Sequence, residues 1–191
     1  MCIRDSFYPG KNLGAYGDAG AVMTDDADIA DTMRMMSQHG SKVRYEHEIL
    51  GFNSRLDTLQ AVVLTAKLAQ LDRWNKLRQA AADRYAALLA DLDGVRLPVT
   101  ADGNQHVWHL YVVRVSRRHE VLAGLHERGI GAAIHYPHPV HLHPAFSGLG
   151  LTRGAFPLAE KASDEILSLP MFPGITAEQQ DRVVEALRAS L

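Results

Sequence analysis

The sequence has little of what an extracellular, membrane-embedded or nucleic-acid-binding protein needs. Its 191 residues include one cysteine, Cys2, so the chain cannot form an internal disulfide, which is typical of a reducing compartment. No apolar run approaches the roughly 20 residues that a membrane span requires. With 20 basic and 22 acidic residues the formal net charge is -2, and no basic patch favours nucleic acid. We therefore expect a cytoplasmic protein with neither a nucleic-acid nor a membrane partner.

The composition is that of a globular protein, with 47% hydrophobic and 22% charged residues. The first half predicts a loop over residues 7–20, a short strand over 21–24 and a helix from Asp25 or Asp26 to about residue 37. A much longer helix is predicted from about residue 55 to 92. A helix of that length bends near residues 72–73 or connects two domains.

The second half changes character and predicts alternating strands and helices. A strand is expected over residues 107–115, a helix over 117–128 and another strand over 130–135. Helices follow at about residues 157–166 and 176–191. This β-α-β run and the helices after it indicate a small α/β domain.

One lysine has an unusual setting. Lys11 lies between Gly10 and Gly14 in a turn flanked by apolar segments. Burial of such a lysine disfavours its ammonium form and leaves a nucleophilic amine. The hydroxyl of Ser6 and nearby backbone N–H groups are suited to a phosphate, so amine and hydroxyl together provide two anchors for pyridoxal phosphate (PLP). The alternative, a solvated turn lysine, stays open on spacing alone.

Four ordered blocks extend this reading along the chain. They are SFYPGKNLG with GDAGA (residues 6–14 and 17–21), GFNSRLDTLQA (51–61), HYP with VHL (135–137 and 140–142), and LSLP with FP (167–170 and 172–173). Together they resemble the nucleotide-sugar aminotransferases of the DegT–DnrJ–StrS family, which are PLP enzymes of fold type I. The resemblance covers essentially everything from Ser6 onward.

The resemblance implies a role for each matching residue. Lys11 would hold the cofactor as a Schiff base and later shuttle a proton, and Ser6 would hydrogen-bond the cofactor phosphate. Asn53 would reach the phosphate in the neighbouring subunit, with Arg55 binding a carboxylate or phosphate beside it. The sugar and amino-donor site would be lined by Tyr8, His135, Tyr136 and His141.

The resemblance also implies an α/β fold of the aspartate-aminotransferase type. Residues 1–92 would be the C-terminal part of the large PLP-binding domain, and residues 93–191 the small domain. The implied reaction transfers an amino group from glutamate to a nucleotide-linked keto-sugar of the dTDP-3-keto-6-deoxyhexose type, in amino-sugar and polysaccharide biosynthesis. Sites shared between subunits imply a homodimer.

Some of these side chains can also be interpreted without a role in a cofactor or substrate site. Asn53 can be the N-cap of the long helix, and Arg55 an exposed arginine at its start, although a cation is disfavoured at that end of the helix dipole unless an anion is bound there. The histidines between His135 and His143 suggest zinc, but Pro137 and Pro139 interrupt the run and no cysteine or carboxylate lies in it. We therefore expect no metal site.

Relatives carry an acidic residue facing the pyridine nitrogen, and it precedes the Schiff-base lysine. Only ten residues precede Lys11, so we expect an N-terminal portion to be missing, with residues 1–5 a foreign start. One alternative is therefore a truncated, non-catalytic remnant. Another is a PLP-dependent sugar dehydratase; the dehydratases of this family carry histidine at the Schiff-base position, and Lys11 argues against that class.

Overall fold

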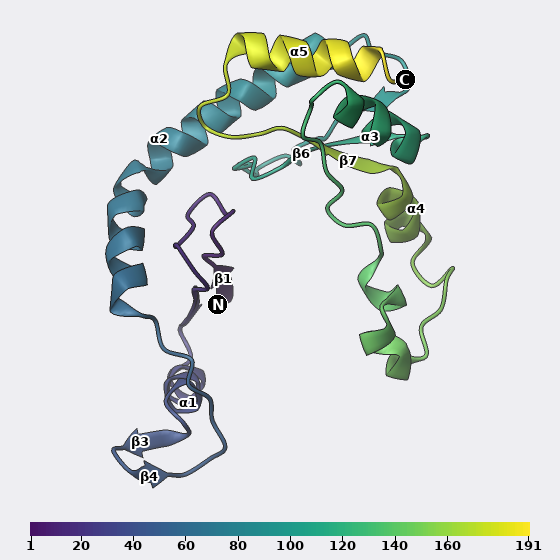
Figure 1. Cartoon of the computed structure of the whole chain (residues 1–191). Coiled ribbons are helices and arrows are strands. Elements are labelled where there is room, and N and C mark those ends of the chain that lie inside the picture. Colours follow the sequence, from purple (N-terminus) through teal and green to yellow (C-terminus); the bar gives the residue numbers. More distant parts are fainter. The chain divides into compact units, whose positions relative to one another are not determined.

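The computed structural model describes all 191 residues, which divide into two compact units, residues 1–73 and 74–191 (Figure 1). The boundary lies inside the long helix α2 (Thr58–Leu89). It therefore precedes residues 92 and 93, where we placed the limit between the large and the small domain, and that assignment stays a prediction. No helix is both long and apolar enough to cross a membrane.

The first unit begins with an antiparallel pair of strands. β1 (Cys2–Ser6) pairs with β2 (Gly20–Thr24), and the register places Ser6 opposite Gly20. Helix α1 (Ala27–Ser37) follows, and the Asp26 carboxylate accepts hydrogen bonds from the amides of Asp28 and Ile29 as its N-cap. The strand over 21–24 and the helix to residue 37 are thus confirmed. Residues 2–5 of the expected foreign start form β1 together with Ser6, and the foreign origin of residues 1–5 stays a prediction.

Residues 40–51 form a short loop, called the β3–β4 excursion, that leaves the end of α1 and returns to it. It contains the strands β3 (Ser41–Val43) and β4 (Glu46–His47), which pair with each other. Its base is closed by the contact of two glycine backbones, since a Cβ on Gly40 would lie 1.7 Å from the Ile49 carbonyl oxygen and one on Gly51 would lie 2.1 Å from the Gly40 nitrogen. Only glycine fits such an approach.

Helix α2 is confirmed as the longest helix, but it is shorter than predicted at both ends, and it buries only some of its apolar residues. In the first unit Leu64 is buried, whereas Leu59 and Leu68 are exposed. In the second unit Ala81, Ala82, Tyr85 and Leu89 are buried at helical spacing.

The second unit is built on a three-stranded antiparallel sheet of β5 (Val95–Arg96), β6 (Tyr111–Val115) and β7 (Ile166–Leu169), in that order. Helices α3 (Arg118–Glu127) and α5 (Ala177–Arg188) contribute to the core that this sheet forms with α2, and α5 starts at a capping box between Thr176 and Gln179. In the sequence between α3 and β7 the chain also forms the short helices η1 (Val140–Leu142) and η2 (Pro144–Leu149) and the helix α4 (Pro157–Glu165) (Figure 1).

The strand prediction for residues 130–135 is wrong, because only Ala133 pairs, through a single bridge to Ser168. The predicted strand 107–115 begins later, at Tyr111, since Trp108 has a φ of 48° that breaks an extended run. The strand that completes the sheet is β7, whose first residue we had assigned to the end of a helix. Ile166 is already extended, with a ψ of 138°.

Candidate functional site

Lys11 lies on a closed loop between β1 and β2. The Lys11 amide donates to the Tyr8 carbonyl at 2.8 Å, which closes a turn around Pro9 and Gly10. Two further bonds close the base of the loop, from the Phe7 amide to Ala19 and from the Ala15 amide to the Phe7 carbonyl. Lys11 is half-buried. Its position is therefore set by backbone hydrogen bonds rather than by a hydrophobic core.

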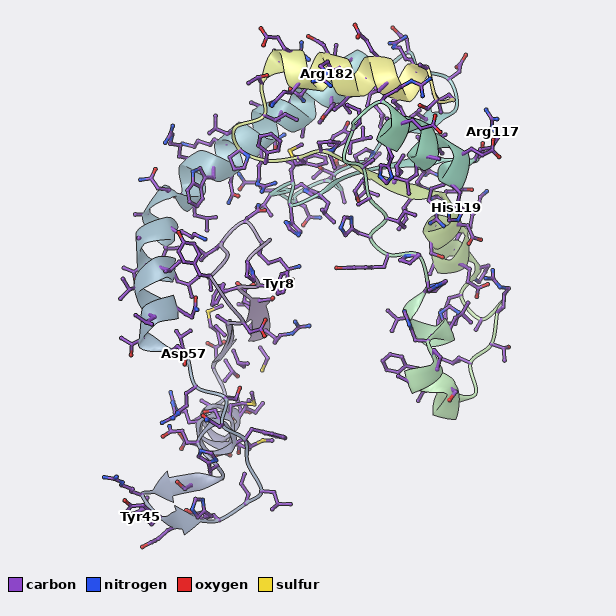
Figure 2. All side chains as sticks on the ribbon, viewed as in Figure 1. Tyr8, Tyr45, Asp57, Arg117, His119 and Arg182 are labelled. Carbon is purple, nitrogen blue, oxygen red and sulfur yellow. The ribbon has the colours of Figure 1, made fainter.

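Ser6 is the last residue of β1, and its hydroxyl accepts a hydrogen bond from the Tyr8 amide at 3.4 Å. Tyr8 begins the turn that carries Lys11, and its ring is exposed (Figure 2). The structure thus brings three of the predicted residues, Ser6, Tyr8 and Lys11, onto one strand-to-turn segment. A primary amine and a hydroxyl on such a segment suit a ligand with a carbonyl and an anionic group.

Two residues of α2 contact this loop, and sequence reasoning gave neither of them a role. Gln60 accepts a hydrogen bond from the Tyr16 amide through its side-chain oxygen at 2.8 Å. The ammonium of Lys67 donates to the Gly14 carbonyl at 2.6 Å and lies 4.5 Å from the centre of the Tyr16 ring. Gln60 belongs to the recognised block 51–61, which was the only signal for it, and Lys67 had none.

Asn53 and Arg55 form a separate pair in the first unit. The Arg55 Nε atom donates to the Asn53 side-chain oxygen at 3.3 Å, and both residues are exposed. The plain N-cap reading of Asn53 is wrong, because α2 begins at Thr58 and Asn53 instead bridges to Gln38 at the end of α1. For the same reason Arg55 is not at the helix start, so the helix dipole gives no argument for an anion beside it.

In the second unit His135 has a fixed partner. Its Nδ1 atom lies 2.8 Å from the hydroxyl oxygen of Ser168, which is buried in β7. The peptide bond to Tyr136 is cis, and the two rings meet edge to face with centres 5.5 Å apart. Tyr136 is exposed. The pair therefore combines a held imidazole with an accessible phenol.

His141 is held by a carboxylate. Its Nε2 atom lies 3.0 Å from the Glu160 carboxylate, and both side chains are only 8% exposed. The same carboxylate accepts from the amides of Gly154 and Phe156. These hydrogen bonds, that of Gly154 above all, lower the pKa of Glu160 and outweigh the opposing effect of burial. Sequence reasoning missed this partner, which is 19 residues away.

Residues 135–143, called the histidine segment, border a mostly apolar pocket of about 660 Å³ against α4. Its lining includes Tyr136, His138, His141, His143, Phe146 and Phe156. Nowhere in the chain do three or more His, Cys, Asp or Glu side chains gather in a way that could hold a metal ion.

The chain is similar to known proteins over nearly its whole length. Residues 4–188 match the DegT/DnrJ/EryC1/StrS aminotransferase family. The dTDP-3-amino-3,4,6-trideoxy-alpha-D-glucose transaminase of Streptomyces venezuelae is 49% identical over 183 residues, which are 96% of this chain and 48% of that protein.

Solved structures agree with the family match. The crystal structure of S. venezuelae DesV in complex with a ketimine intermediate superposes with a TM-score of 0.93 at 48% identity, covering 98% of this chain and 51% of that one. The Bacillus subtilis NtdA structure with bound cofactor PMP has a TM-score of 0.85 at 35% identity, covering 97% of this chain and 45% of that one. The chain thus spans about half the length of the relatives that it matches, and the fold-type-I expectation is confirmed.

Proposed function

This chain belongs to the DegT/DnrJ/EryC1/StrS aminotransferase family, and on that premise we propose that it serves the PLP-dependent transfer of an amino group to a nucleotide-linked keto-sugar. The proposed acceptor is a dTDP-3-keto-6-deoxyhexose, in agreement with the name of the S. venezuelae relative. Glutamate is the proposed donor, and amino-sugar or polysaccharide biosynthesis the setting. Since the chain spans only about half of its relatives' length, the activity proposed here is that of the whole protein.

The observation that carries this proposal is the placement of Lys11 on a closed turn that directly follows Ser6, the last residue of β1. The Lys11 amide and the Ser6 hydroxyl both hydrogen-bond to the backbone of Tyr8. We assign to Lys11 the covalent attachment of the cofactor through its amine, and to Ser6 a hydrogen bond to the cofactor phosphate. When bound, PLP withdraws electrons from the carbon that carries the transferred nitrogen. Once the donor amine has displaced it, Lys11 Nζ would take the proton from that carbon and deliver it to the cofactor within the same half-reaction, and it would move a proton in the opposite direction in the second half.

Asn53 and Arg55 are proposed to serve the cofactor site of a second subunit in a homodimer. Both are exposed, so they are available to another chain. The segment before them also exposes large apolar side chains, with Tyr45 at 79% and Leu50 at 97%, which is typical of a surface that another protein covers. Sedimentation analysis of the full chain tests the dimer directly.

The remaining assignments concern substrate contacts. Tyr8 and Tyr136 present exposed phenols, and His135 presents an imidazole oriented by Ser168, so these three are proposed to contact the sugar or the amino donor. His141 is proposed in the same site, with its ring held by Glu160. The single cysteine supports a cytoplasmic location for the protein.

The decisive experiment is reconstitution with PLP followed by absorbance spectroscopy. We expect wild type to give a red-shifted band, relative to free PLP, that survives dialysis, and Lys11→Ala to lose it entirely. Borohydride reduction and peptide mass spectrometry should place the modification on Lys11. Lys42→Ala, which changes an exposed lysine of the same unit, is the matched control and should behave as wild type.

A stable band in Lys11→Ala, or modification of another lysine in wild type, would refute the assignment of Lys11. Wild type that gives no band after reconstitution would count against cofactor attachment by this chain. In the whole protein, added glutamate should convert the band and release 2-oxoglutarate. No conversion there would contradict the proposed donor.

A further inference from the structure

One face of α2 is directed at the Lys11 loop. Gln60, Leu64 and Lys67 are spaced by four and three residues, so they share one side of the helix. Leu64 is the buried member of the three, at 8% exposure, while its two neighbours carry the polar groups. We call this face, formed by Gln60, Leu64 and Lys67, the α2 clamp.

Residues 14–17 of the loop lie against the α2 clamp. The Lys67 ammonium donates a hydrogen bond to the Gly14 carbonyl, and the Gln60 side-chain oxygen accepts one from the Tyr16 amide. Between those two residues Ala15 is completely buried. A Cβ added to Gly17 would lie 3.0 Å from the Gln60 side-chain nitrogen, so the backbone approaches the amide closely there. Four consecutive loop residues are thus fixed relative to the helix.

The loop transmits this position to the Lys11 turn. The Ala15 amide donates to the Phe7 carbonyl at 2.7 Å, at the point where the chain leaves β1. Gly14 packs so tightly on the turn that an added Cβ would lie 2.3 Å from the Pro9 carbonyl oxygen. The Lys11 turn therefore has little freedom to move unless residues 14–17 leave α2.

We propose that Lys67 and Gln60 are positioning residues that hold the Lys11 turn in place through the Gly14 carbonyl and the Tyr16 amide. The proposal rests on the proposed role of Lys11 as cofactor anchor. Lys67 is the stronger member, because its hydrogen bond is charge-assisted and its ammonium also lies over the Tyr16 ring. Neither residue is assigned any contact with the cofactor.

The test compares Lys67→Met with Lys67→Arg in the full chain. Methionine keeps the aliphatic length but removes the ammonium, whereas arginine can still donate to the Gly14 carbonyl. Without cofactor, amide hydrogen exchange at Ala15 and Tyr16 should become about tenfold faster in Lys67→Met, and arginine should restore it. With cofactor, Lys67→Met should need about tenfold more PLP to reach half of the absorbance band. Lys76→Met, an exposed lysine of the same helix, is the control.

Unchanged exchange at Ala15 and Tyr16 in Lys67→Met would overturn the proposal, as would their full exposure to exchange in wild type. Faster exchange spread over all of α2 would also overturn it, because Lys67 would then act on general stability. Gln60→Leu supplies an independent variant, for which faster exchange confined to Tyr16 and Gly17 is expected. Failure of the proposed function gives a different result, in which wild type shows no absorbance band while the exchange data still decide whether the clamp exists.

Discussion

The two units of the molecule are stabilised in different ways. The second unit, residues 74–191, contains a single cluster of buried apolar side chains from α2, the three-stranded sheet, α3 and α5. The first unit, residues 1–73, buries only Ala15, Met35 and Leu64 among its apolar residues, and most of the large exposed apolar side chains of the chain belong to it. It relies on strand pairing, a helix cap and backbone hydrogen bonds in loops.

This difference bears on function because Lys11 lies in the unit without a core. A lysine in a hydrogen-bonded loop is accessible to a ligand, but its position depends on a few polar contacts. The histidine segment, in contrast, is attached to a unit whose sheet and helices form a core of their own. We infer that the second unit acts as a scaffold, while the geometry of the first unit is more easily altered by single polar substitutions.

The largest expected effect tests this comparison directly. Leu125→Ala removes a side chain of α3 that is completely buried, and we expect it to lower the free energy of unfolding by about 2–5 kcal/mol. Leu59→Ala removes a side chain of α2 that is 80% exposed, and we expect a change within about 0.5 kcal/mol. Urea unfolding followed by circular dichroism measures both. Equal losses in the two variants would show that the first unit also depends on apolar burial.

An intermediate effect is expected from Glu160, whose carboxylate joins Gly154, Phe156 and His141 in the second unit. Its pKa is lowered in the folded state, so the ionised form stabilises the fold above the ordinary value of 4.5, and this contribution is lost as the pH falls through the lowered pKa. Wild type should be more stable than Glu160→Gln at neutral pH, and the gap should close in acid. Thermal unfolding across this range measures it, and a gap independent of pH would contradict the expectation.

The smallest effects should come from ion pairs, in either unit. Asp181 pairs with Arg84 between α5 and α2, with side chains 46% and 33% exposed, so Asp181→Asn should cost at most about 1 kcal/mol. Asp31 pairs with Arg34 within α1 and both are mostly exposed, so Asp31→Asn should cost about 0.3 kcal/mol. Urea midpoints compare the two. A larger loss for Asp31→Asn than for Asp181→Asn would contradict the order that the exposures of the two ion pairs predict.

Local sequence was sufficient where the determining contacts are local. The α1 helix with its Asp26 cap, the long helix and the helix that ends near Gly129 were predicted, because spacing and capping are encoded within a few residues. The β7 strand was missed because four residues carry too little periodicity to separate a strand from a helix end. A strand was wrongly predicted over residues 130–135, where the structure has a single bridge between Ala133 and Ser168, because so short a segment also carries too little periodicity.

The same division holds for the candidate site. Lys11, Ser6 and Tyr8 share one short stretch of sequence, so their association was visible before the structure. Lys67 contacts a residue 53 positions away, and Glu160 one that is 19 positions away. Neither pairing has a local signature, so only the fold shows that these charges belong to the loop and to the histidine segment.

The glycine contact at the base of the β3–β4 excursion has a consequence for engineering. Because Gly40 and Gly51 meet directly, and the Glu48 amide donates to the Gly40 carbonyl at 2.8 Å, the ends of the excursion stay together whatever lies between them. Its tip at Arg44 and Tyr45 is exposed. The fold of the chain should therefore tolerate a peptide grafted at this tip, since lengthening a loop whose ends are already joined adds little entropic cost. Because Tyr45 belongs to the surface proposed to be covered in the homodimer, the same graft should weaken the dimer.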